Sequence, residues 1–76
     1  MKAIRKKPGC APEIIEVENT LKALQDEVGG YIEAVTLPYG AVLICNEDGR
    51  ILGLPDNGRV CGVDVVGTVL IVGTKG

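Results

Sequence analysis

Residues 45–59 read Cys-Asn-Glu-Asp-Gly-Arg-Ile-Leu-Gly-Leu-Pro-Asp-Asn-Gly-Arg, with two turn signals on either side of a short apolar run. Turns are predicted at Asn46–Gly49 and Pro55–Gly58, because Asp and Asn side chains cap turns and glycine adopts positive φ without steric cost. The apolar run Ile51–Leu54 predicts a short strand between them. Most polar side chains suited to a binding site are therefore expected around one strand.

Aliphatic runs outside this stretch predict further strands. Tyr31–Leu37 alternates, with Tyr31, Glu33, Val35 and Leu37 on one face. Ala41–Cys45 is apolar on both faces, as is typical of a central strand that is covered on both sides. The remaining predictions are strands at Lys2–Lys6, Glu13–Val17 and Gly67–Gly73, an N-terminal hairpin formed by the first two, an ambiguous segment at Arg59–Val66 and a tail at Thr74–Gly76.

One amphipathic helix is predicted over about residues 20–28. Leu21, Leu24, Gln25 and Val28 share one face. Asn19 is the expected N-cap and Gly29-Gly30 the left-handed end, and Lys22 is expected to pair with Asp26. The predicted order is β-β-α-β-β-β-β. It indicates an α+β fold, a small and mainly antiparallel sheet with one helix packed on it, in a single domain over residues 1–76.

The composition limits the core and the classes of partner. The 76 residues include no Phe and no Trp, so the core must be aliphatic. Such a small core favours homo-oligomerisation, which buries more surface. The net charge of −2 makes nucleic acid an unexpected partner. The basic cluster at Lys2, Arg5, Lys6 and Lys7 is interpreted as a solvated edge strand or a frayed end, with phosphate attraction as the alternative.

Location and chemistry follow from what the sequence lacks. It has no run of 18 apolar residues and no signal-peptide pattern, so a cytoplasmic protein without a membrane span is expected. Cys10, Cys45 and Cys61 are widely spaced and the sequence has no His, which argues against a zinc site or a disulfide framework; reduced and mostly buried thiols are predicted. Without Ser, His or a phosphate-binding glycine loop, no enzyme activity, cofactor or metal is predicted.

Six residues are candidates for binding a ligand. Tyr31 could stack on a base beside Glu33, although Tyr31 could instead pack under the helix. Arg50 and Arg59 close the two turns and suit phosphate or carboxylate groups, although both could be ordinary surface arginines. Asn46 and Asn57 could fix a sugar or a base edge, although Asn57 could simply cap its own turn.

Four blocks of the sequence carry a resemblance to a known family. They are Gly29–Val35 (Gly-Gly-Tyr-Ile-Glu-Ala-Val), Leu43–Gly49, Leu52–Asn57 (Gly-Leu-Pro-x-Asn within it) and the strand Gly67–Gly73. Over about residues 2–73 the chain resembles a small domain of unknown function found in bacteriophages, prophages and mobile elements. The resemblance implies a protein that acts inside a bacterial cell.

That context gives two main hypotheses. The first is a non-catalytic protein that sequesters a signalling nucleotide at subunit interfaces and so counters host defence, using the six candidate residues. The alternative is an interaction protein that blocks a host defence or restriction factor without a small-molecule ligand. A structural or regulatory domain without a small ligand is a third.

Overall fold

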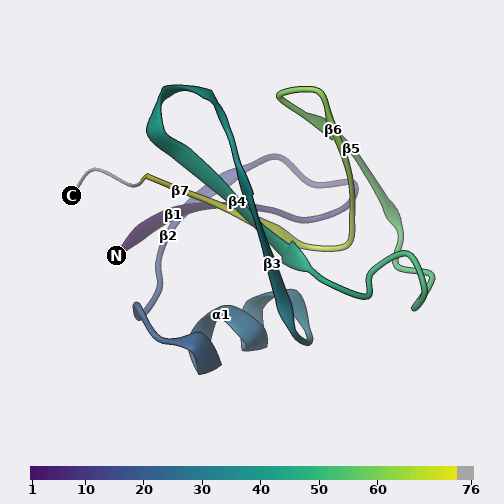
Figure 1. Ribbon diagram of the computed structural model, residues 1–76, viewed down its shortest axis with the longest axis horizontal. Helices are drawn as coiled ribbons and strands as arrows, with labels where there is room; N and C mark the ends of the chain where they lie inside the picture. Colours follow the sequence, from purple (N-terminus) through teal and green to yellow (C-terminus); the bar gives the residue numbers. More distant parts are fainter. Residues whose placement is uncertain (74–76) are drawn as a thin grey trace.

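The computed structural model describes residues 1–73, and one α-helix and seven strands lie within this range (Figure 1). Their bounds are β1 (Lys2–Lys6), β2 (Glu13–Glu16), α1 (Leu21–Val28), β3 (Ile32–Thr36), the 3₁₀ turn η1 (Pro38–Gly40), β4 (Ala41–Asn46), β5 (Asp56–Val60), β6 (Val63–Val66) and β7 (Val69–Gly73). The predicted α+β class and order are confirmed, with the hairpin β5–β6 in place of the single strand predicted before the last one. The predicted tail at Thr74–Gly76 lies outside the described residues.

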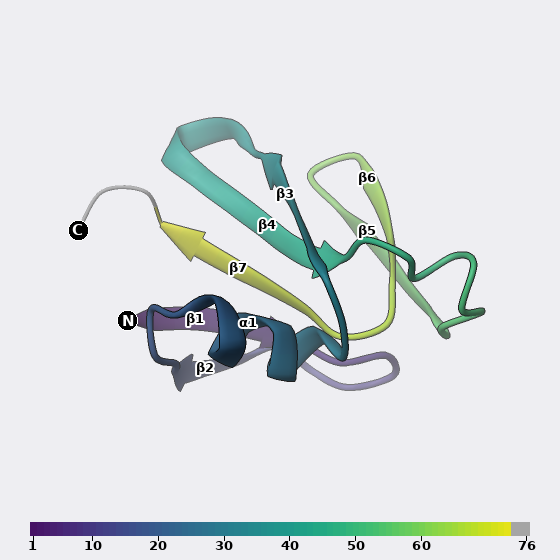
Figure 2. The same ribbon diagram turned by 60° about the horizontal axis from the view of Figure 1, so that its bottom comes forward.

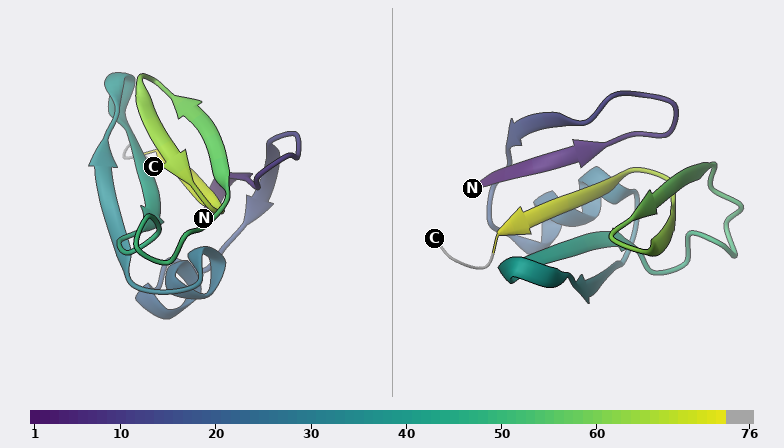
Figure 3. Two further views of the ribbon diagram at one scale, coloured as in Figure 1. Left: turned by 90° about the vertical axis from the view of Figure 1, so that its right-hand side faces the viewer. Right: turned by 90° about the horizontal axis from the view of Figure 1, so that it is seen from above.

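Five strands form one antiparallel sheet in the order β2-β1-β7-β4-β3, and β5 pairs with β6 as a separate hairpin. Seen from above, the five strands follow one another in this order, and the hairpin lies over one end of the sheet (Figure 3). One row of paired residues crosses the sheet through Ile14, Ile4, Ile71, Leu43 and Val35. The predicted N-terminal hairpin β1–β2 is confirmed.

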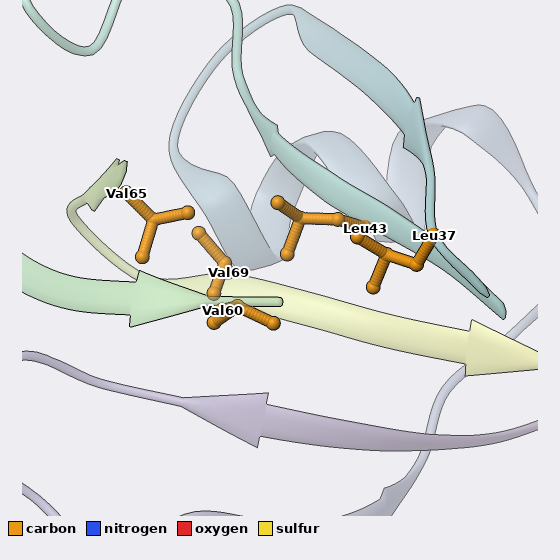
Figure 4. Packing of buried hydrophobic residues seen from close by; sticks show 5 residues of the cluster. All are labelled: Leu37, Leu43, Val60, Val65 and Val69. Carbon is orange, nitrogen blue, oxygen red and sulfur yellow. The ribbon is translucent and has the colours of Figure 1, made fainter. Parts of the chain in front are cut away.

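The molecule has three layers because the central strands are apolar on both faces. On one face, Val28 of the helix packs with Ile44 and Leu70. On the other face, Leu43 and Val69 pack against the hairpin, in a cluster completed by Leu37, Val60 and Val65 (Figure 4). The prediction that Ala41–Cys45 is a central strand covered on both sides is confirmed.

The predicted strand at Ile51–Leu54 is wrong. This segment forms turns, held by bonds from Leu52 N to Asp48 O (2.9 Å) and from Leu54 N to Gly49 O (3.0 Å). Ile51 is 86% exposed, so this apolar side chain has no core to enter. The apolar run predicted a strand here, but local turn bonds satisfy the backbone first.

The predicted turn at Pro55–Gly58 is also wrong, because β5 begins at Asp56. The ambiguous segment Arg59–Val66 contains the real reversal. Cys61 (φ 47°) and Gly62 (φ 83°) both have positive φ, as a two-residue type I′ hairpin turn requires. A cysteine in this conformation is uncommon, which is why the sequence did not indicate the turn.

The helix matches its prediction except at its first residue. Thr20, not Asn19, is the N-cap, and its hydroxyl oxygen accepts a hydrogen bond from the Ala23 amide at 3.2 Å. The helix begins at Leu21, so Thr20 occupies the position where a side chain reaches the free amides of the first turn. Gly29 ends the helix with φ 81°. The predicted ion pair is also present, between Lys22 Nζ and Asp26 Oδ2 at 3.0 Å.

The basic N-terminal segment is predicted to be an edge strand or a frayed end, and this prediction is wrong. β1 lies between β2 and β7, and two of its cations are bound within the fold. Arg5 lies 2.9 Å from carboxylate oxygens of both Glu13 and Glu27, and Lys6 Nζ lies 2.6 Å from the side-chain oxygen of Asn57. This arrangement ties β1 to its neighbour β2, to the helix and to the hairpin.

Cys10 and Cys61 are exposed and Cys45 is half-buried, and all three are free thiols in the part of the chain that the structure describes. The prediction of mostly buried thiols is therefore wrong for Cys10 and Cys61, which lie in turns, where side chains point to solvent. Among residues 1–73, no helix is long and apolar enough to cross a membrane.

Candidate functional site

A groove of about 330 Å³ opens between the β3–β4 side of the sheet and strand β6, and we call it the sheet–hairpin groove. It is lined by Glu33, Val35, Cys45, Asn46, Glu47, Gly49, Arg50, Ile51, Val63, Asp64, Val65 and Val66. Aliphatic side chains form much of its wall, and charged groups stand around them. This combination of an apolar surface with a few polar groups is typical of a binding site.

Local structure explains why these residues meet. Glu33 and Val35 alternate along β3 toward the hairpin, and Cys45 lies directly opposite Glu33 on β4. The loop after β4 then folds back over β6. Gly49 makes this close approach possible, since a Cβ atom at that position would lie 2.8 Å from a Val66 methyl carbon.

The groove carries more negative than positive charge. Its charged lining residues are Glu33, Glu47 and Asp64 against one cation, Arg50. Arg50 Nη2 donates to the backbone oxygen of Asp64 at 3.3 Å. Among residues 1–73, Arg50 has no carboxylate oxygen within ion-pair distance. Its guanidinium therefore keeps donors for an incoming acceptor. The carboxylates of Glu33 and Glu47 favour an incoming donor or cation, whereas that of Asp64 is already paired with Arg59.

Cys45 is the nucleophilic side chain of the groove. Burial raises the pKa of its thiol, and the charge of the nearby Glu33 carboxylate raises it further. The Cys45 sulfur lies 3.7 Å from the Glu33 backbone oxygen and 3.9 Å from its Oε1 atom. A thiol with a raised pKa stays protonated and is a poor nucleophile, so Cys45 acts here as a weak donor and packing group.

Two of the six predicted binding residues, Asn46 and Asn57, use their side chains for hydrogen bonds within the fold. The Asn46 amide donates to Val28 O at 3.1 Å, and its side-chain oxygen accepts from the Asp48 amide at 2.8 Å. Asn57 is 3% exposed and donates to Lys6 O and to Gly67 O at 2.9 and 2.8 Å. Asn46 touches the groove from within the fold, and Asn57 joins the hairpin to the sheet.

Of the other four predicted residues, two lie together in the groove and two lie elsewhere, apart from each other. Glu33 and Arg50 lie together in the groove, although 17 positions separate them in the sequence. Tyr31 is 69% exposed and lies in a shallow hollow beside the helix end, with Gln25 and Gly30. Arg59 pairs with Asp64 on the outside of the hairpin, with Nε 2.9 Å from Oδ1. The structure therefore does not bring Tyr31 or Arg59 into one pocket with Glu33.

Sequence reasoning missed three groove residues. Cys45 lies opposite Glu33 only in the observed register of β3 and β4. Glu47 was interpreted as an ordinary turn residue. Asp64 could not be placed, because the hairpin that carries it was not recognised. No cluster of three or more His, Cys, Asp or Glu side chains that could hold a metal ion occurs within the described part of the chain.

The chain belongs to the family described as domain of unknown function DUF3846, whose model matches residues 1–76. This confirms membership of a family of unknown function over the whole chain. No curated protein and no solved structure gives a significant match.

Proposed function

We propose that this DUF3846 domain is a non-catalytic protein-binding module of a bacteriophage or other mobile element, and that it blocks a host defence or restriction factor in the bacterial cytoplasm. The observation that carries the proposal is the charge of the sheet–hairpin groove, where the carboxylates of Glu33 and Glu47 lie near one arginine, Arg50. Carboxylates beside aliphatic side chains suit the basic and apolar side chains of a protein partner.

The distribution of cations supports a protein partner over a nucleotide. Phosphate groups are held by several converging Lys, Arg or backbone N–H donors. Arg5 and Arg59 are already paired with carboxylates, and Lys6 is bonded to Asn57. One chain therefore offers a nucleotide only Arg50 within the groove, beside the carboxylates of Glu33 and Glu47, which repel phosphate.

Nucleotide sequestration is the second candidate, and a specific observation favours it. Glu33 and Arg50, which were predicted to contact the sugar or base and the phosphate respectively, line the same groove. On this proposal, a second copy of the chain supplies the missing cations at a subunit interface. The predicted homo-oligomer is thus a requirement of the nucleotide proposal but not of the protein-binding one.

An affinity experiment tests the main proposal. The tagged domain is expected to capture one dominant protein from a host lysate and to inhibit that protein's activity when the purified components are mixed. The charge reversals Glu33→Lys and Glu47→Lys are expected to abolish both effects, with Glu18→Lys, an exposed site outside the groove, as the matched control. Capture that is insensitive to both groove substitutions would contradict the proposal.

A nucleotide panel separates the two candidates. A true ligand at 100 times its dissociation constant stabilises the folded chain by about 2.7 kcal/mol, which a thermal melt detects easily. Cyclic dinucleotides, cyclic ADP-ribose isomers and linear nucleotides are expected to leave the melting temperature unchanged. A shift that Arg50→Ala removes would favour the nucleotide candidate instead.

A further inference from the structure

Strand β3 forms one edge of the five-stranded sheet and, among residues 1–73, pairs with β4 alone. The two strands lie next to each other in Figure 2. The bonds from Leu37 N to Ala41 O and from Glu47 N to Tyr31 O show that the backbone N–H and C=O groups of the odd-numbered residues in this segment point toward β4. The backbone N–H and C=O groups of Ile32, Ala34 and Thr36 consequently point away from the sheet, because these groups alternate along an antiparallel strand. They form a row of donors and acceptors suited to another strand.

The opposite edge is protected, whereas β3 is not. Strand β2 has four residues, begins and ends with Glu13 and Glu16, and follows Pro12. Short length, charge and proline are the features by which proteins block edge-to-edge pairing. Strand β3 has the sequence Ile-Glu-Ala-Val-Thr, with no proline and one charge. Of the two edges of the five-stranded sheet within residues 1–73, the β3 edge is therefore the one open to an added strand.

The open edge adjoins the sheet–hairpin groove. Glu33 and Val35 are the two β3 side chains that line the groove, so a strand added beside β3 would place alternate side chains next to them. The groove adds a second carboxylate, that of Glu47, beyond Glu33. A basic side chain opposite Glu33 is favoured by this charge, and an apolar one is favoured opposite Val35.

We propose that β3 accepts an extended segment of a partner protein as a sixth strand, and that this segment carries Lys or Arg two positions from an aliphatic residue. Backbone bonds to the open edge supply affinity, and the groove selects the basic side chain, as in other cases of strand addition. This inference rests on the proposed protein-binding function and names the chemistry of the partner.

Synthetic peptides provide the test. The probe is a fluorescent, terminally blocked peptide, Thr-Val-Thr-Lys-Thr-Val-Thr, and its control has Glu in place of Lys. Fluorescence anisotropy is expected to show at least tenfold tighter binding of the Lys peptide to the full chain. The substitution Glu33→Lys is expected to reverse that preference, a readout that a merely structural role of Glu33 would not produce.

The edge itself is tested by Ala34→Pro, which removes an outward-facing N–H and leaves the β3–β4 bonds in place. Binding of the Lys peptide is expected to fall at least tenfold. The matched control is Ile14→Pro, at an outward-facing position of β2, and it is expected to leave binding unchanged. Circular dichroism monitors folding; if Ala34→Pro does not fold, the charge-reversed Glu33→Lys chain still decides the question.

Three results would overturn the inference: equal affinity for the two peptides, full binding by folded Ala34→Pro, or a dimer of the free chain that Ala34→Pro dissociates. The last would mean that a second copy occupies β3. Capture of a host protein by the Ala34→Pro chain would reject this edge while leaving the proposed protein-binding function intact. The two proposals can therefore fail separately.

Discussion

Asn57 illustrates how one buried amide can hold two parts of a small fold together. Its NH₂ group bonds to backbone oxygens of β1 and of the link before β7, and its oxygen accepts from Lys6 Nζ at 2.6 Å. The Asp-Asn-Gly sequence indicated a turn because those residues are common in turns. Burial of a side chain depends on distant strands, which local sequence does not report.

Asn57→Ala is expected to lower the free energy of unfolding by about 1–3 kcal/mol, because buried carbonyl oxygens lose their donors. Urea denaturation measures the change. Arg59→Ala is the control, since this arginine is exposed on the same strand, and a change within about 0.5 kcal/mol is expected. An unchanged midpoint for Asn57→Ala would contradict the structural role and revive the predicted binding role.

Cys45 is expected to react with iodoacetamide more slowly than the exposed Cys10 and Cys61, because burial raises the pKa of its thiol and only the thiolate attacks. Peptide mass spectrometry from pH 7 to 9 measures the three rates. Glu33→Gln is expected to speed the Cys45 reaction by removing a repelling charge, and Glu18→Gln, outside the groove, is the control. Equal rates at all three cysteines would contradict the raised pKa.

The raised pKa of the Cys45 thiol also makes the free energy of unfolding depend on pH. The folded chain holds the Cys45 proton to higher pH than the unfolded chain does, so between the two pKa values the unfolded state binds fewer protons. The contribution of this thiol to stability is present below the unfolded pKa of about 8.5 and is lost as the pH rises toward the folded value. Cys45→Ala is expected to flatten this part of the pH dependence in denaturant titrations.

At the scale of elements, hydrophobic periodicity identified the helix and the strands of the large sheet. It failed at Ile51–Leu54, where four mostly apolar residues form turns, and at the hairpin, where Cys61 adopts positive φ. Ile51–Leu54 is held by its own turn bonds, whereas the hairpin takes its position from packing over the sheet. The groove depends on that packing, so Glu33 and Arg50 could be predicted as site residues and Asp64 could not.

The helix start gives a prediction at this scale. Thr20→Ala is expected to cost about 1 kcal/mol of stability, because the Ala23 amide loses its side-chain acceptor. Asn19→Ala is the matched control, and a change within about 0.5 kcal/mol is expected there, since Asn19 lies one residue before the cap. Equal losses for the two variants in urea denaturation would restore Asn19 as a capping residue.

At the scale of the whole molecule, the sheet is unevenly covered. The helix covers one face, whereas the hairpin covers only one end of the other face (Figure 3). The uncovered end has an apolar hollow of about 260 Å³, lined mainly by Ile4, Ile14, Ala41 and Ile71. The strand register places these side chains on one face, and the position of the hairpin decides which of them it covers.

This uncovered hollow is the surface on which the predicted homo-oligomer can be tested. Ile14 is 77% exposed there, and contact with a second copy of the chain through this hollow would bury it. Light scattering of the native chain is expected to give twice the 8.0 kDa monomer mass.

Ile14→Ser is expected to give the monomer without loss of folding, because an exposed side chain contributes little to the core of one chain. Ile51→Ser, equally exposed but on the far loop, is the control and is expected to keep the dimer. A native chain that remains monomeric at millimolar concentration would reject self-association and leave the hollow open to another partner.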